Sequence, residues 1–275
     1  MTAAIKRLIR EALTEDLGDR GDVTTRFFVS PKAKLSGRII AKQEGVICGT
    51  EVAAQVFRTL GCRADILVAD GRRVKPGRAV MHVRGGPAVL SAERTALNFL
   101  QHLSGVATLT AAYVDRVRGT KSRILDTRKT LPGWRALDKY AVLCGGGRNH
   151  RMGLYDAVLL KDNHWAAGAD VVGQVKAVRK RHPGISVEIE AAGLSQVRRA
   201  LEAGPDIILL DNMPPALLRQ AIGLVRRASR KIQVEISGGV TLKTIRRLAK
   251  LGPDRISIGR ITHSAPALDL SLEIP

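Results

Sequence analysis

The sequence predicts an α/β protein in which an N-terminal α+β part is followed by a (β/α) barrel, complete or partial. Two observations predict it: short β-prone runs broken by glycine and proline fill residues 35–86, and apolar strands alternate regularly with helices from residue 123 onward. Strands that alternate with helices in this way form a parallel sheet buried on both faces. A flat doubly wound sheet is the alternative that the pattern leaves open.

The N-terminal part begins with an amphipathic helix, because residues 3–13 carry apolar side chains at helical spacing behind Thr2, which can cap the helix. Three β-prone runs follow, at 37–41, 66–69 and 79–83. A helix is predicted over 52–60, ending at Gly61. Two more helices are predicted over 92–103 and 106–117, because Gly105 lies between them.

The second part repeats the strand–helix unit. The predicted strands are 123–126, 156–161, 185–190, 206–211, 232–236 and 255–259, and the clearest helices are 171–181, 195–203, 216–228 and 242–251. Each strand ends in polar residues. In a parallel barrel these ends share one face, where the loops that build active sites converge.

The polar residues at this face sort by charge. Glu190 and Asp211 end neighbouring strands and would repel an anion unless a divalent cation or sugar hydroxyls lie between, and Mg²⁺ prefers few carboxylates plus substrate phosphates. A structural salt bridge to a nearby Lys or Arg is the alternative for this pair. The cationic groups, which suit carboxylates and phosphates, are Arg128, Lys129, His150, Arg151 and Lys161. The sequence therefore predicts a site for an anion beside a Mg²⁺-bound phosphorylated sugar.

A glycine-rich turn predicts where a phosphate binds. Ser237-Gly238-Gly239 follows a strand and precedes a helix that we expect to be capped near Thr241, so backbone N–H groups and a helix N-terminus can hold a phosphate there. Gly259, after the next strand, matches the second half of the phosphate site of barrels. The histidines show no HxxxH or HExxH spacing, which argues against a zinc site.

Composition limits the other classes of protein. The chain has 275 residues and a formal net charge of +20, which attracts polyanions, but aromatic residues make up only 3 % and no nucleic-acid-reading module is recognisable. A nucleic-acid-binding protein is thus the alternative from another class. Much of the charge lies on predicted helix faces, as at Arg198 and Arg199.

Cys48, Cys62 and Cys144 lie far apart without a CxxC motif, which fits a reducing compartment. With no signal-peptide pattern and no apolar run of about 18–20 residues, we expect a cytoplasmic protein.

At these residues the sequence resembles the quinolinate phosphoribosyltransferase family. The resemblance rests on a long motif at 124–164, ILDTRKTLPGWRALDKYAVLCGGGRNHRMGLYDAVLLKDNH, and on shorter ones at 93–98, 210–213, 235–239 and 259–264. It implies an N-terminal α/β sandwich domain, residues 1–105 completed by 266–275, and an open (β/α) barrel domain, residues 106–265. It also implies a homodimer or hexamer in which a partner subunit completes each active site.

The reaction that the resemblance implies takes quinolinate and phosphoribosyl pyrophosphate, with Mg²⁺, to nicotinate mononucleotide, pyrophosphate and CO₂ in de novo NAD biosynthesis. A related transferase with another acceptor, such as nicotinate, is the nearest alternative. Ser237, Gly238 and Gly259 match the phosphate-binding positions of the family, and Glu190 and Asp211 match the carboxylates that face the ribose and the metal-linked donor. The implied quinolinate-binding residues are Arg94 from the neighbouring subunit, Arg128, Lys129, His150, Arg151 and Lys161; the implied catalytic residues are Lys129, Lys161, Glu190 and Asp211.

Two positions depart from the family pattern. Ala191 and Ala192 follow Glu190 where a further acidic residue is usual, which leaves the details of the ribose side open. Arg260 stands where a small residue is more common. Neither departure touches the cationic set.

Overall fold

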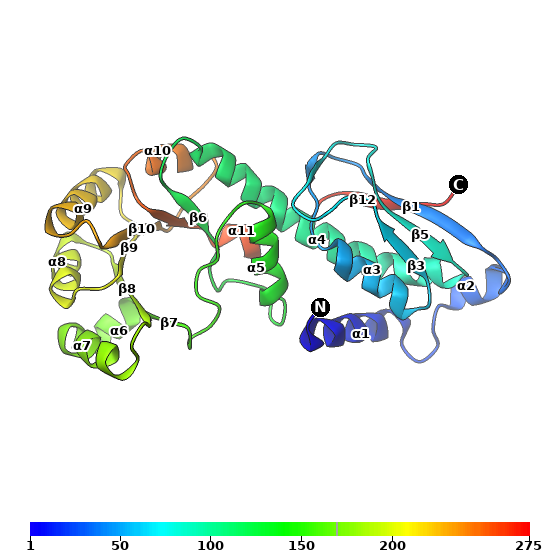
Figure 1. Ribbon diagram of the computed structural model, residues 1–275, viewed down its shortest axis with the longest axis horizontal. Coiled ribbons are helices and arrows are strands. Elements are labelled where there is room, and N and C mark those ends of the chain that lie inside the picture. The colour runs from blue at the N-terminus through cyan, green and yellow to red at the C-terminus, as the bar shows by residue number, and fades with distance from the viewer. Residues whose placement is uncertain (169) are drawn as a thin grey trace. The chain divides into compact units, whose positions relative to one another are not determined.

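The computed structural model describes residues 1–168 and 170–275, which fold into two compact units (Figure 1). The first unit comprises residues 1–111, 131–146 and 264–275, and the second comprises 112–130 and 147–263. The boundaries predicted from the sequence placed three segments of this first unit in the barrel: 106–111, 264–265 and, the longest of them, 131–146. This segment contains helix α5 (Arg135–Cys144), and its position in the chain does not reveal which core it packs into.

The first unit is built on an antiparallel sheet with strand order β12-β1-β5-β3. These strands are β12 (Leu270–Glu273), β1 (Leu35–Ala41), β5 (Ala79–Gly85) and β3 (Arg63–Ile66). A two-stranded sheet pairs β2 (Gly45–Val46) with β4 (Arg73–Val74). The helices are α1 (Ala3–Leu17), α2 (Val23–Phe28), α3 (Thr50–Thr59), α5 and residues 88–111 of α4 (Ala88–Val117). Helix α3 packs against β3 and α1 packs against α3, in agreement with the predicted α/β sandwich. The strand predicted at 66–69 was misplaced, since β3 ends at Ile66.

Gly105 does not interrupt a helix, and the prediction of two helices was wrong. Helix α4 runs unbroken over Ala88–Val117. A Cβ atom at Gly105 would lie 2.1 Å from the backbone oxygen of Pro266 and 3.0 Å from Cα of Ala267. Glycine is therefore required because the chain that leads into β12 crosses the helix at this point.

The second unit contains a parallel sheet with strand order β6-β11-β10-β9-β8-β7. The strands are β6 (Arg123–Leu125), β7 (Ala157–Leu160), β8 (Ser186–Ala191), β9 (Ile207–Asp211), β10 (Gln233–Ser237) and β11 (Arg255–Ser257). From β7 to β11 the neighbours follow chain order, and β6 then pairs with β11. A doubly wound sheet would reverse its order at a switch point. The fold is therefore the predicted open barrel, with its opening between β6 and β7.

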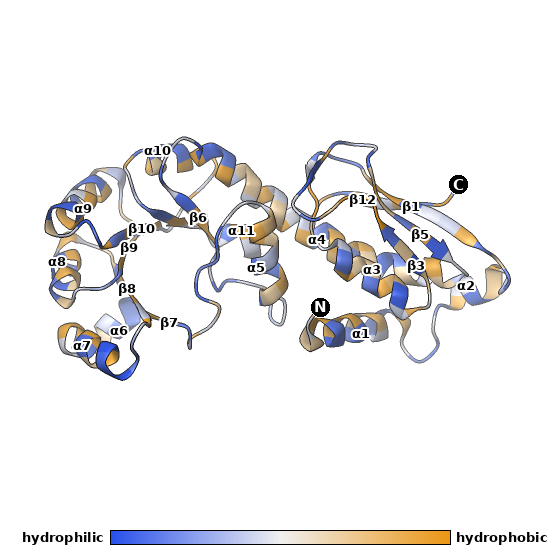
Figure 2. Ribbon diagram, in the orientation of Figure 1, coloured by the Kyte–Doolittle hydropathy of each residue, from blue (hydrophilic) through white to orange (hydrophobic). Residues whose placement is uncertain are grey.

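Helices α7 to α9 lie on the outside of this sheet (Figure 1). The helices of the unit are α6 (Asp162–Ala166), α7 (Val171–Arg181), α8 (Leu194–Ala203), α9 (Pro215–Ala228), α10 (Ile245–Ala249) and α11 (Arg260–His263). Helix α8 buries Val197, Ala200 and Ala203 at helical spacing and exposes Arg198 and Arg199, as predicted. Hydrophilic and hydrophobic residues alternate around these helices in Figure 2.

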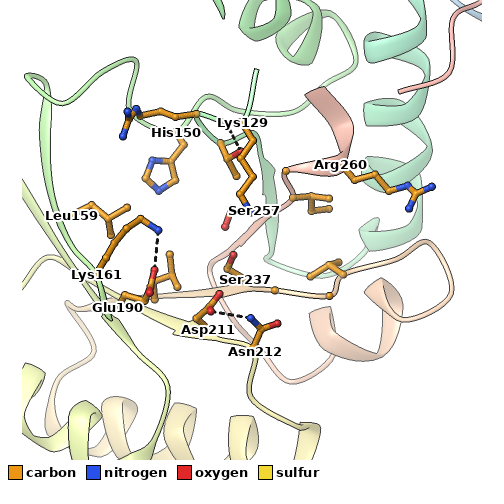
Figure 3. A pocket seen from close by; sticks show the side chains of 18 of the residues that line it. Lys129, His150, Leu159, Lys161, Glu190, Asp211, Asn212, Ser237, Ser257 and Arg260 are labelled. Carbon is orange, nitrogen blue, oxygen red and sulfur yellow. Dashed lines mark hydrogen bonds and ion pairs between the residues drawn. The ribbon is translucent and has the colours of Figure 1, made fainter. Parts of the chain in front are cut away.

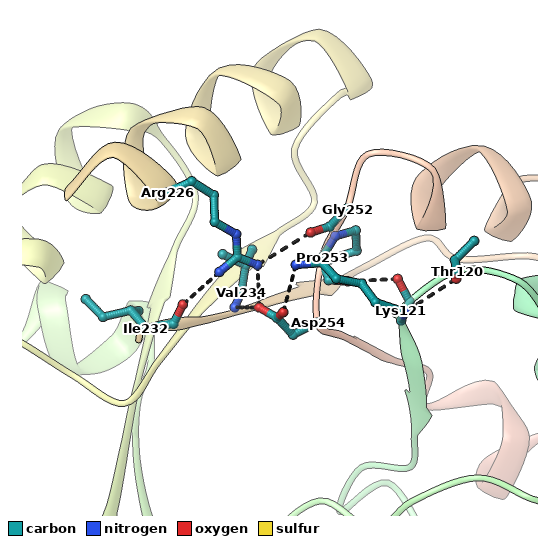
Figure 4. Close-up of polar contacts among 9 residues, drawn as sticks. Thr120, Lys121, Arg226, Ile232, Val234, Gly252, Pro253 and Asp254 are labelled. Carbon is teal, nitrogen blue, oxygen red and sulfur yellow. Dashed lines mark hydrogen bonds and ion pairs between the residues drawn. The ribbon is translucent and has the colours of Figure 1, made fainter. Parts of the chain in front are cut away.

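The N-terminal ends of the strands are joined by ion pairs around Asp254 (Figure 4). Its carboxylate pairs with Arg226 of α9 and with Lys121 at 3.0 Å, and it accepts the N–H of Val234 at 2.8 Å. Burial opposes ionisation of Asp254, but these hydrogen bonds outweigh it and lower the pKa of the carboxyl group. The cluster fixes α9, β10 and the start of β11 to one another at the end of the barrel opposite the predicted site.

Among the helices in the described residues, none is long and apolar enough to span a membrane.

Candidate active site

The strands of the barrel carry acidic side chains on their inner face. Along β8, Val187 and Ile189 alternate with Glu188 and Glu190, and successive side chains of a strand point to opposite faces. In the parallel register Glu190 lies opposite Leu209, two residues before Asp211, and Asp211 lies opposite Ser237. Glu190, Asp211 and Ser237 thus come together at the C-terminal end of the sheet, with Glu188 one layer below.

A cavity of about 690 Å³ opens at this end of the barrel (Figure 3). Arg94 lies on α4 in the first unit, where its side chain is exposed. The other predicted site residues line the cavity: Arg128, Lys129, His150, Arg151, Lys161, Glu190, Asp211, Ser237, Gly238 and Gly259. Their convergence at one face confirms the placement expected from strand order, while their roles in binding remain predictions.

Two guanidinium groups, those of Arg128 and Arg151, lie among the cationic groups of the cavity. The Nε atoms of Arg128 and Arg151 are buried and, within the described residues, have no hydrogen-bond partner. Burial lowers the pKa of Arg151, and the neighbouring positive charge of Arg128 lowers it further. Buried N–H donors without acceptors, held close to a like charge, are costly unless an anion binds between them. The arrangement is therefore that of an anion-binding site.

His150 is fixed by buried acidic side chains. Its Nε2 lies 3.0 Å from Glu188 and 3.6 Å from Glu235, and Arg255 pairs with Glu235 at 2.7 Å. The backbone N–H of Arg151 donates to Nδ1 of the ring at 2.8 Å, which places the proton of the neutral ring on Nε2. The sequence pattern assigned no role to Glu188 or Glu235. The sequence feature that could have identified them is an acidic residue at an inward-facing position of an otherwise apolar strand.

Lys161 and Glu190 form an ion pair at the mouth of the cavity, with 3.0 Å between Nζ and Oε2. The indole of Trp165 donates to the backbone oxygen of Glu190 at 3.0 Å and fixes α6 against β8. The alternative of a salt bridge therefore holds for Glu190. The Asp211 carboxylate accepts a hydrogen bond from the side-chain amide of Asn212 at 3.0 Å.

The loops after β9 and β10 approach each other closely. Asn212 adopts a positive φ of 51°, and its N–H donates to Ser237 at 3.0 Å. A Cβ at Gly238 would lie 2.1 Å from the Asn212 amide oxygen, so only glycine fits there. The helix predicted over 242–251 is shorter in the structure, although the hydroxyl of Thr241 accepts the N–H of Thr244 at 3.3 Å, as expected of a cap near Thr241. Residues 241–244 form a turn, and α10 begins at Ile245 with five residues, so the phosphate site would have to depend on loop backbone.

Both units of the chain are similar to known proteins. A family model described as "Quinolinate phosphoribosyl transferase, N-terminal domain" matches residues 22–104, and its C-terminal counterpart matches residues 106–273. The nicotinate-nucleotide pyrophosphorylase [carboxylating] of Mycobacterium leprae is 42 % identical over 98 % of this chain and 97 % of its own length. The chain belongs to the quinolinate phosphoribosyltransferase family.

Solved structures of quinolinate phosphoribosyltransferase relatives share the whole fold. The nicotinate-nucleotide pyrophosphorylase of Ehrlichia chaffeensis is 37 % identical and covers 100 % of both chains with a TM-score of 0.93. That of Francisella tularensis is 36 % identical, with a TM-score of 0.93 over 99 % of this chain and 96 % of its own. The long motif that carried the family resemblance folds as β6, α5, β7 and the loops between them.

The structure shows where Arg260, one departure from the pattern of the quinolinate phosphoribosyltransferase family, lies in the site. Arg260 lines the cavity, but its guanidinium points away from Glu190 and Asp211 (Figure 3). Its positive charge instead acts on the phenol of Tyr113. The extra cation therefore does not join the carboxylate side of the site.

Proposed function

We propose that this chain transfers the phosphoribosyl group of phosphoribosyl pyrophosphate to quinolinate with decarboxylation. The products are nicotinate mononucleotide, pyrophosphate and CO₂, in de novo NAD biosynthesis. The observation that carries the proposal is the pair of buried Nε–H donors of Arg128 and Arg151, which have no acceptor among the described residues, in one cavity with Glu190 and Asp211. One end of this cavity suits an anionic ring, and the other suits a sugar that develops positive charge.

The acceptor is proposed to bind at the cationic end. Quinolinate carries two carboxylates on a planar ring, and planar guanidinium groups hydrogen-bond carboxylates through two parallel bonds. In the proposal Arg128 and Arg151 hold these carboxylates, with Lys129, His150 and Lys161 around the ring. Arg94 is proposed to reach the acceptor from a neighbouring subunit, and its exposure on α4 is consistent with an intersubunit contact.

The donor is proposed to bind at the carboxylate end, with its phosphate on the backbone at Ser237, Gly238 and Gly259. Loss of pyrophosphate gives the anomeric carbon oxocarbenium character, which nearby carboxylates stabilise. Glu190 and Asp211 are the carboxylates in position. Lys161 holds the Glu190 side chain in place through their 3.0 Å contact.

The donor set also fits Mg²⁺, which we propose as the cofactor. The Asp211 carboxylate accepts a hydrogen bond from the neutral amide of Asn212, whereas the Glu190 carboxylate is paired with the charged Lys161. A single hard oxygen ligand beside a pyrophosphate is a common magnesium environment. Bound there, Mg²⁺ would neutralise charge on the departing pyrophosphate.

The second half of the reaction needs electrostatic stabilisation of a different kind. Loss of CO₂ leaves an electron pair on a ring carbon, and a cation beside the ring favours that state over the ground state. Lys129 and Lys161 both line the cavity and are proposed to supply this positive charge next to the acceptor. A proton must then reach the ring carbon.

Two features of the biological setting belong to the same proposal. We place the enzyme in the cytoplasm, a reducing compartment, with support from the three free thiols Cys48, Cys62 and Cys144. We also propose a homodimer, or a hexamer built from dimers, because Arg94 is assigned to the site of another subunit.

The deciding experiment is an assay of the purified full chain with quinolinate, phosphoribosyl pyrophosphate and Mg²⁺. The release of CO₂ and the formation of nicotinate mononucleotide are followed, and nicotinate replaces quinolinate in a parallel reaction. We expect turnover with quinolinate and little with nicotinate. Folded protein that turns over neither acceptor would refute the proposal, and preference for nicotinate would reassign the acceptor.

A further inference from the structure

A second cluster of reactive side chains lies in the first unit, outside the cavity of the barrel. The Sγ atoms of Cys48 and Cys144 and a carboxylate oxygen of Asp70 all lie within 4.8 Å of one another. The phenol of Tyr140 donates to Asp70 at 3.0 Å. Nothing in the proposed reaction uses these groups.

The two cysteines differ in access to solvent. Cys48 lies between β2 and α3 and is 0 % exposed; the hydroxyl of Ser104 accepts its N–H at 2.9 Å and donates to its carbonyl at 3.1 Å. Cys144 is the last residue of α5 and is partly exposed. A Cβ at the following Gly145 would lie 2.4 Å from the backbone oxygen of Ala107, so the end of α5 is also held in place. Only Cys144 can meet a reagent from solution first.

The surroundings stabilise a thiolate on Cys144. A hydrogen bond from the Cys48 thiol lowers the pKa of Cys144, against burial and the charge of Asp70. The same hydrogen bond, together with burial, raises the pKa of Cys48. The exposed cysteine is thus the nucleophile, and the buried one keeps its proton.

A metal ion is a poorer occupant of this cluster. The Asp70 carboxylate already accepts the N–H groups of Gly49 and Thr50, the hydroxyl of Thr50 and the hydroxyl of Tyr140. A carboxylate offers about four lone-pair sites, so its acceptor capacity is in use. What remains is a pair of neighbouring thiols, one activated and one shielded.

We propose that Cys48 and Cys144 are the site of a reversible intramolecular disulfide, formed by exchange with a low-molecular-weight disulfide such as oxidised glutathione. The Cys144 thiolate attacks the oxidant, breaks its S–S bond and expels one glutathione thiolate. Cys48 then loses its proton and attacks Sγ of Cys144, which expels the second glutathione. The two protein thiols lose two electrons and two protons, and the oxidant is reduced to two molecules of glutathione.

The test is peptide mapping of the full chain after incubation with oxidised glutathione. We expect an intact mass lower by two hydrogens, a cross-linked peptide pair containing residues 48 and 144, and an alkylatable Cys62. A stable glutathione adduct on Cys144, a cross-link between two chains, or a disulfide that includes Cys62 would overturn the proposal. This measurement needs no variant and therefore does not depend on a variant folding.

Matched variants separate the two steps. Cys48→Ser is expected to accumulate the mixed disulfide on Cys144, whereas Cys144→Ser should form neither product at the wild-type rate. Cys62→Ser, which removes a buried thiol elsewhere in the unit, should behave as the wild type does. Circular dichroism checks that each variant is folded.

The pH dependence of alkylation tests whether Cys144 is the cysteine that attacks first. The pH dependence of Cys144 alkylation by iodoacetamide should have its midpoint below that of an ordinary cysteine and should move upward in Cys48→Ala, which lacks the S–H donor. Alkylation of Cys144 with the midpoint of an ordinary thiol, unchanged in Cys48→Ala, would contradict activation by Cys48.

Discussion

The imidazole Nε2 of His150 lies 3.0 Å from Oε2 of Glu188, and the two side chains are only 8 % and 4 % exposed. Burial disfavours the imidazolium form. The hydrogen bond to Glu188 and the charges of Glu188 and Glu235 outweigh burial and the charge of Arg255, and they raise the pKa of His150. The protonation state of a residue at the cavity wall is therefore set from beneath the cavity.

Replacing Glu188 should change that state. Glu188→Gln keeps the side-chain shape but removes the charge, so we expect the pKa of His150 to fall. The check is ¹⁵N NMR of histidine-labelled protein, which also reports the tautomer. At high pH the wild-type ring should carry its proton on Nε2. An unchanged titration of His150 in the variant would show that Glu188 does not control it.

Glu235 should make the protein less stable as pH rises. Burial, together with the neighbouring Glu188, raises the pKa of Glu235 to about 7, against the attraction of His150 and Arg255. Because the folded state binds this proton more tightly than the unfolded state, the contribution is greatest in acid and is lost as pH rises through about 7. Urea unfolding on both sides of this range should show a loss of about 1–3 kcal/mol that is reduced in Glu235→Gln. Equal pH slopes for both proteins would contradict the assignment.

Arg128 and Arg198 provide a matched comparison of two arginines. Arg128→Ala should lower kcat/KM for quinolinate by about 10²-fold, because it removes a buried charged donor from the cavity. Arg198→Ala, on the exposed face of α8, should change kcat/KM by less than about threefold. Steady-state kinetics with both variants measures the difference, and equal losses would remove Arg128 from the site.

Chelation of divalent cations should abolish turnover, and added Mg²⁺ should restore it. Asp211→Asn retains the shape of the side chain but has no charge, so it should raise the Mg²⁺ concentration needed for half-maximal activity by about tenfold or more. Asp65→Asn, which removes a surface partner of Arg84 in the first unit, is the control. Activity in excess chelator would disprove the requirement for a cation.

The Asp254 cluster should stabilise the barrel. Asp254→Asn removes the negative charge that Arg226 and Lys121 pair with and is expected to lower the free energy of unfolding by about 1–3 kcal/mol. Because the pKa of Asp254 is lowered in the folded protein, its contribution is present at neutral pH and is lost as pH falls below the ordinary carboxyl range. Urea unfolding at neutral and acid pH tests this, and the deficit of the variant should shrink in acid.

The barrel was predictable from the sequence because short, largely apolar strands alternate regularly with helices from residue 123 onward. Parallel pairing then brings the ends of the strands to one face, which is why Glu190, Asp211 and Ser237 were found together without knowledge of the fold. The short strands β2 and β4 have only two residues each, too few for any period to show.

The wrong or missing predictions have one cause: the residue pattern of a segment does not show which other segment packs against it. Gly105 has the pattern of a helix break, but its role is to admit the backbone of Pro266. The inward layer of Glu188 and Glu235 depends on strand register. The cysteines at 48 and 144 are far apart in the chain, and only the placement of α5 in the first unit brings them together.

The pairing of β12 with β1 has a consequence for synthesis of the protein. Strand β1 spans residues 35–41, and its partner spans residues 270–273. A ribosome makes every strand of the barrel before it makes β12. The barrel sheet can therefore form while the first unit still lacks an edge strand, and β1 presents unpaired N–H and C=O groups for that interval. Nascent chains halted before residue 270 should accordingly depend more on chaperones than completed ones do.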